Sequence, residues 1–118
     1  MILGYPHFCL SLNDTPELVE RLAERVGRIQ CDVLRRLVKM PEAFAVWYGD
    51  DLAFTERLLV SPKTLRRWFF PWIEELAGIA RHAGMPFILH SHSSLVSTIC
   101  SPLSAYPSRS INLSRTAE

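Results

Sequence analysis

Apolar residues recur at helical spacing through the first third of the chain. Just before them, Thr15 can cap a helix, Pro16 suits its first turn, and Glu17 complements the positive end of the helix dipole. The recurring apolar positions are Leu18, Leu22, Val26, Ile29, Val33 and Leu37. The pattern predicts an amphipathic helix over about residues 16–39, closed by Met40–Pro41.

Two short apolar runs follow, and each predicts a β-strand. Residues 43–48 and 86–90 are continuous apolar segments, which are typical of strands buried on both faces in a parallel sheet. Ser61–Pro62 predicts a helix start between the two runs, and Ala83–Gly84 predicts the helix end. Pro71 is expected to kink this helix or to divide it in two. The order strand, helix, strand predicts a βαβ unit with a right-handed crossover.

Acidic residues stand where the first predicted strand ends. Gly49 closes the run, and Asp50 and Asp51 follow it directly. At a strand's carboxyl end these carboxylates are candidates to bind a metal, a substrate amine or a pyrrole N–H. The alternative is structural: Asp50 caps the next turn, and Asp51 is solvated or paired with an arginine. Tyr48 either donates its hydroxyl to a substrate carboxylate or packs as an aromatic residue against the crossover helix.

Histidines mark the end of the second predicted strand. His90 and His92 are two residues apart, so in an extended chain both imidazoles point to the same side and could share one ion. Zinc is the metal considered, although two ligands alone make a poor zinc site. The alternative is that the histidines hydrogen-bond their neighbours. No cofactor other than zinc is expected.

Composition limits the classes of function. A chain of 118 residues with 48% hydrophobic and 21% charged residues is expected to form one globular domain. A formal net charge of +1 argues against a nucleic-acid or anionic-membrane partner. No apolar run approaches the roughly 20 residues that span a bilayer. Cys9, Cys31 and Cys100 show neither metal-like nor disulfide-like spacing, which favours a reduced, cytoplasmic compartment and unreactive thiols.

Several segments, in this order and spacing, resemble the uroporphyrinogen decarboxylase superfamily. The branch that the chain most resembles contains proteins related to methylcobamide:coenzyme M methyltransferases. The resemblance covers roughly residues 4–91. It is carried by Asn13–Val19, Tyr48–Ala53, Leu59–Pro62, Phe70–Trp72 and His82–Ser91.

The resemblance implies a (β/α)8 barrel, with its site at the carboxyl ends of the strands. Such a barrel needs about 250 residues, so this chain would hold a part of it: about two parallel strands with flanking helices. Intact members decarboxylate uroporphyrinogen in porphyrin biosynthesis or transfer methyl groups from corrinoids. Their small-molecule substrates are a tetrapyrrole or a corrinoid-linked methyl donor. True decarboxylases carry a substrate-contacting serine where this chain has Asp50. Zinc methyltransferases carry a His-x-Cys pair at this place in the chain. Here the two positions are His90 and His92, so a histidine stands where those proteins have the cysteine.

The resemblance stops near residue 92, so the chain is interpreted as two parts. Residues 1–92 are expected to be a fragment of a uroporphyrinogen-decarboxylase-like domain. The serine-rich residues 93–118 are an irregular tail without family resemblance, for which an out-of-frame reading is our hypothesis. We expect the fragment to be inactive alone. One alternative is a small self-associating interaction module. The other is a small metal-binding protein that uses Asp50, Asp51, His90 and His92.

Overall fold

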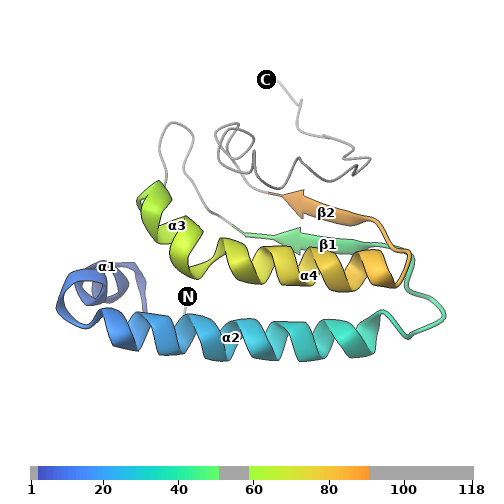
Figure 1. Cartoon of the computed structure of the whole chain (residues 1–118), viewed down its shortest axis with the longest axis horizontal. Coiled ribbons are helices and arrows are strands. Elements are labelled where there is room, and N and C mark those ends of the chain that lie inside the picture. The colour runs from blue at the N-terminus through green and yellow to red at the C-terminus, as the bar shows by residue number, and fades with distance from the viewer. Residues whose placement is uncertain (1–2, 51–58, 91–118) are drawn as a thin grey trace, which may run out of the picture.

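The computed structural model of the chain describes residues 3–50 and 59–90. The described part has mixed α/β structure, with four helices and two strands (Figure 1). In chain order these are α1 (Tyr5–Asp14), α2 (Pro16–Leu37), β1 (Val46–Gly49), α3 (Pro62–Trp68), α4 (Phe70–His82) and β2 (Phe87–His90). Across these described ranges, no helix is both long enough and apolar enough to cross a bilayer.

The two strands form a parallel sheet, as the apolar runs predict. β1 pairs with β2 in a register that sets Val46 opposite Phe87 and Gly49 opposite His90. α3 and α4 lie between the strands in sequence, so β1, α3, α4 and β2 form the expected strand–helix–strand unit. In Figure 1, α4 runs between the sheet and α2. The described residues contain this two-stranded sheet and no closed barrel.

Three helix boundaries follow local sequence signals: the start of α3, the division between α3 and α4, and the end of α4. Ser61 caps α3, because its Oγ accepts a hydrogen bond from the Thr64 backbone N–H at 3.1 Å. The helical segment divides at Phe69, and Pro71 lies in the first turn of α4, where its missing N–H is not needed. Gly84 follows α4 with a φ of 72°, a left-handed conformation that glycine adopts without strain. All three predictions are confirmed.

The N-terminal region differs from expectation in two ways. Residues Tyr5–Asp14 form the helix α1, which the sequence pattern did not predict. Thr15 makes no side-chain cap for α2; its backbone N–H instead donates to the Ser11 carbonyl oxygen at 3.1 Å and closes α1. The predicted Thr15 cap is therefore wrong, because this residue serves as the junction between two successive helices. Pro16 and Glu17 occupy the first turn of α2 as expected.

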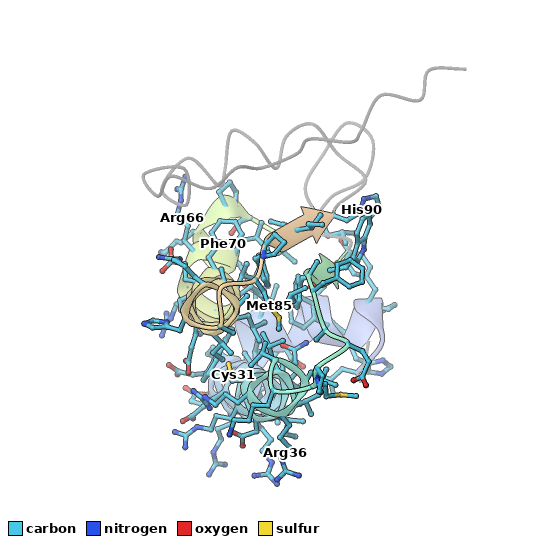
Figure 2. All side chains as sticks on the ribbon, turned by 90° about the vertical axis from the view of Figure 1, so that its right-hand side faces the viewer. Cys31, Arg36, Arg66, Phe70, Met85 and His90 are labelled. Carbon is cyan, nitrogen blue, oxygen red and sulfur yellow. The ribbon has the colours of Figure 1, made fainter. Side chains whose placement is uncertain are left out.

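The core lies between the helices and one face of the sheet. One cluster joins Leu65, Phe70 and Ile73 of α3 and α4. A second joins Cys31 and Leu34 of α2 to Leu76 of α4. Tyr48 and Phe87, from the two strands, pack against both clusters. Figure 2 shows Phe70 and Cys31 on the helical side of the sheet.

Two burial expectations need correction. The buried residues of α2 are Val19, Gly27, Cys31 and Leu34. The predicted apolar stripe lies beside them and is largely exposed: Ile29 and Val33 each keep 49% of their surface accessible. β1 is not buried on both faces, since Trp47 is 61% exposed. In the described part, helices cover one face of the sheet, and Trp47 stands on the other.

Candidate functional site

The carboxyl ends of the two strands meet, which brings the backbones of Asp50 and His90 together. Gly49 pairs with His90 in the sheet, and the Asp50 N–H donates to the His90 carbonyl oxygen at 3.1 Å. The parallel sheet thus sets two of the sequence-predicted site residues at one edge. Asp51 and His92, which the sequence analysis grouped with them, lie outside the described residues.

The side chains of Asp50 and His90 point to opposite faces of this edge. Side chains alternate along a strand, so His90 shares the open face with Trp47. Their rings lie 5.4 Å apart with an interplanar angle of 31°. Asp50 follows on the helical face with Tyr48. In Figure 2, His90 lies at the rim of the sheet, away from Cys31 and the helices. The structure therefore groups Asp50 with Tyr48, and His90 with Trp47.

Tyr48 packs as an aromatic residue, which is the structural alternative, and its hydroxyl lies beside Asp50. Its ring packs in the core and stacks on Phe87, with ring centroids 6.1 Å apart. Its hydroxyl donates to Asp50 Oδ2 at 3.4 Å, a long hydrogen bond. Burial, and then the negative charge of Asp50, raise the pKa of Tyr48 above its usual value of 10.0. Tyr48 is therefore a neutral phenol whose hydroxyl lies at the outer limit of hydrogen-bond distance from the Asp50 carboxylate.

An apolar hollow adjoins Asp50 on the helical side. It is shallow and partly open to solvent, with a cavity volume of about 60 Å³. Its lining residues are Tyr5, Phe8, Asp50, Leu59, Val60, Leu65 and Phe69. Phe8 meets Phe69 edge to face at 6.1 Å, and the Tyr5 hydroxyl donates to the Leu59 carbonyl oxygen at 2.8 Å. Asp50 is the acidic group of an otherwise apolar and aromatic surface.

Sequence reasoning missed the contribution of α1 to this hollow. Tyr5 and Phe8 come from α1 and form one of its walls. A signal was present: Pro6 stands in the first turn of the helix, and Tyr5, Phe8 and Leu12 follow a spacing of three and four residues. The helix is short and its apolar pattern is weak, so the sequence alone does not predict it.

Metal binding finds limited support in the described residues. Across residues 3–50 and 59–90, no three or more His, Cys, Asp or Glu side chains come together in a way that would hold a metal ion. Cys9 and Cys31 are free thiols. Burial is the main cause that raises the pKa of Cys31, so its thiolate form, which metals and electrophiles require, is disfavoured.

The arrangement on the helical face suits one kind of ligand group. A carboxylate held by a neutral phenol, at the border of an apolar hollow, can accept a hydrogen bond from an N–H group whose remaining surface is apolar or aromatic. Comparison of the chain with protein-family models, curated proteins and solved structures gave no match.

Proposed function

We propose that the chain is part of a uroporphyrinogen-decarboxylase-like (β/α)8 barrel and has no catalytic activity alone. One observation carries the proposal: β1 and β2 are parallel neighbours, joined through α3 and α4, and Asp50 follows the first strand at the edge where the second one ends. In barrels of this type the reacting groups stand at the carboxyl ends of the strands.

The two faces of the sheet support this reading. The face with Tyr48 and Phe87 is covered by helices, as the outer face of a barrel strand is. The other face carries Trp47, which is 61% exposed, and His90. In a closed barrel that second face would be turned to the packed interior. Its large exposed aromatic residue is what a strand would show if its neighbouring strands were missing.

Asp50 stands where the resemblance gives true decarboxylases a serine, and its carboxylate offers a different contact, the acceptance of a hydrogen bond. Pyrrole N–H groups are hydrogen-bond donors set in an aromatic surface, and a carboxylate beside an apolar hollow can accept from them. True decarboxylases stabilise a protonated pyrrole intermediate electrostatically, which requires several preorganised groups around the reacting ring. The described part of this chain contributes one carboxylate, Asp50, and one phenol, Tyr48, and both lie on the helix-covered face that would be the outer face of a barrel. We therefore expect no turnover.

An activity assay tests the inactivity. The full chain and its Asp50→Asn variant would be incubated without oxygen with uroporphyrinogen III, and the products would be separated by chromatography. An intact uroporphyrinogen decarboxylase serves as the positive control. We expect no coproporphyrinogen from either form of the chain. Turnover by the chain would contradict the proposed inactivity, and its loss in the Asp50→Asn variant would assign it to Asp50.

The family assignment has a separate test in the gene. The nucleotide sequence on both sides of this reading frame would be translated in all frames. We expect the missing strand–helix units of the barrel upstream, and a family-like continuation in another frame just after the codon of Ser91. A flanking sequence that encodes no such units in any frame would contradict the proposal.

A further inference from the structure

Helix α2 carries an apolar surface that the described fold does not cover. We call the α2 stripe the six residues Leu18, Leu22, Val26, Ile29, Val33 and Leu37. Leu18, Ile29, Val33 and Leu37 are between 47% and 49% exposed. Leu22 and Val26 are partly buried. Single exposed apolar residues are ordinary, but four half-exposed ones in line with these two along a helix of about 33 Å form a surface of the kind that marks an interaction site.

The stripe lies beside the face that packs inside the molecule. α2 turns Gly27, Cys31 and Leu34 toward the core that it shares with α4. The stripe occupies the neighbouring third of the helix surface, and charged residues fill the remainder. In Figure 2, Arg36 projects from α2 away from Phe70 and the sheet, so this outer side of the helix is open to a partner.

The spacing of the stripe is the same in both directions. Successive members are separated by 4, 4, 3, 4 and 4 residues, so a two-fold axis at the level between residues 27 and 28 maps the stripe onto itself. We propose that the stripe is the interface of a homodimer, in which α2 packs antiparallel against α2 of a second copy. Leu18 then meets Leu37 of the partner subunit, and Val26 meets Ile29 of the partner subunit. The 4–3–4 spacing at its centre is that of a coiled-coil seam.

Charges beside the stripe favour the antiparallel arrangement. Arg25 and Asp32 both lie on its outer border and are exposed; Asp32 also pairs with Arg35 of the same helix at 3.0 Å, and its side chain stays 70% exposed. In the antiparallel dimer, Arg25 and Asp32 of the partner subunit are offset by only about 3 Å along the helix axis, and symmetry makes this ion pair twice. A parallel, in-register dimer would offset them by about 10 Å. Within the described residues Arg25 forms no ion pair, so it is available to do so.

This inference concerns the chain of 118 residues and does not depend on the function proposed above. The decisive measurement is sedimentation of the full chain over a range of concentrations, which gives the dimer dissociation constant. Two variants interrupt the stripe, Ile29→Glu and Val33→Glu. Both positions are about half exposed, so the fold should tolerate the changes. We expect each variant to raise the dissociation constant at least about tenfold, because a carboxylate would be buried at the interface.

Matched controls place glutamate at exposed apolar positions elsewhere. Leu10→Glu on α1 and Phe44→Glu before β1 change residues that are 60% and 85% exposed. Both should leave the dissociation constant unchanged. A dimer that is lost in the Phe44→Glu variant and kept in Ile29→Glu and Val33→Glu would assemble through the sheet and would overturn the proposal.

A charge swap tests the orientation and remains informative if the glutamate variants fold poorly. Arg25→Glu and Asp32→Arg should each weaken the dimer by roughly threefold to tenfold, since each sets like charges opposite one another. The double variant Arg25→Glu/Asp32→Arg should restore most of the affinity. No recovery in the double variant would overturn the antiparallel pairing. A chain that stays monomeric at all concentrations would overturn the dimer itself.

Discussion

At the scale of single residues, Gly27 is the position that most sharply limits the packing of the helices. A Cβ atom at Gly27 would overlap the ring of Trp72, because α2 and α4 approach closely there. Gly78 on α4 has nothing within 4 Å of the place where a Cβ would stand. Packing therefore requires a glycine at position 27, whereas position 78 has room for a larger residue.

Gly27→Ala should destabilise the fold. Overpacking in a filled core costs roughly 1–3 kcal/mol, and the better helix propensity of alanine returns at most about 1 kcal/mol. We expect a net loss of about 1–2 kcal/mol, measured by urea unfolding. The matched control, Gly78→Ala, should gain about 0.5–1 kcal/mol from propensity alone. Equal effects of the two substitutions would contradict the close approach of Trp72 to α2.

The raised pKa of Tyr48 predicts that the stability of the fold depends on pH. Burial raises the pKa of Tyr48 above 10.0 in the folded protein, so the folded state holds this proton more tightly than the unfolded state does. The contribution is fully present below pH 10 and is lost as the pH rises through the folded pKa. Tyr48→Phe should therefore reduce the loss of stability between about pH 9.5 and pH 11, measured by urea midpoints. An unchanged slope would mean that the phenol is not buried as described.

The burial of Cys31 predicts that its thiol is protected from alkylating reagents. The residue is 1% exposed, and its burial is the main reason that the pKa of its thiol is raised. Under native conditions at pH 8, alkylation of Cys31 with iodoacetamide should be slower than that of Cys9 by at least about tenfold, because both access and the thiolate fraction are reduced. Peptide mass spectrometry measures both rates in one sample, and urea should abolish the difference. Similar rates in the native chain would show that α2 does not pack against α4.

At the scale of elements, the helix ends follow short-range chemistry. Ser61 caps α3 through one hydrogen bond from Thr64, three residues further on. Gly84 ends α4 because it adopts a left-handed backbone conformation. Such signals need no knowledge of the rest of the fold, and they were predicted from the sequence. Thr15 carries the same signature as Ser61, a hydroxyl residue before proline, yet its side chain caps nothing because α1 ends directly at it.

This contrast gives a matched pair of substitutions. Ser61→Ala should cost about 1 kcal/mol of stability, the usual value for the loss of a side-chain cap. Thr15→Ala should change stability by less than about 0.5 kcal/mol, since no cap hydrogen bond is lost. Thermal or urea unfolding distinguishes the two. A larger cost for Thr15→Ala than for Ser61→Ala would contradict the junction between α1 and α2.

Burial was less predictable than the elements themselves. The apolar face of α2 is wide, and periodicity identifies an apolar arc without telling which part of it meets the core. Gly27 and Cys31 are buried because they are small enough for α4 to approach, a property that depends on Trp72 across the contact. The exposed α2 stripe was the more hydrophobic part of the arc. The close approach of Trp72 to Gly27 is a contact between distant segments, which the periodicity of α2 alone does not reveal.

At the scale of the whole molecule, the parallel pairing of two strands organises the candidate site. The sequence predicted that Asp50 and His90 stand at the ends of neighbouring strands, and the structure sets their backbones 3.1 Å apart from N to O. It could not predict that their side chains lie on opposite faces, because that depends on a register fixed by the sheet. Nor did it predict the hollow beside Asp50, whose walls come from α1, α3 and the segment before α3.

Nuclear magnetic resonance of the isotopically labelled full chain tests this arrangement most directly. The parallel pairing predicts interstrand NOEs between Val46–Gly49 and Phe87–His90 in the register that sets Tyr48 opposite Leu89. It also predicts a coupling across the hydrogen bond from the Asp50 amide to the His90 carbonyl. Close Hα–Hα contacts of the antiparallel kind, or no contact between the two segments, would contradict it and remove the basis for a shared edge.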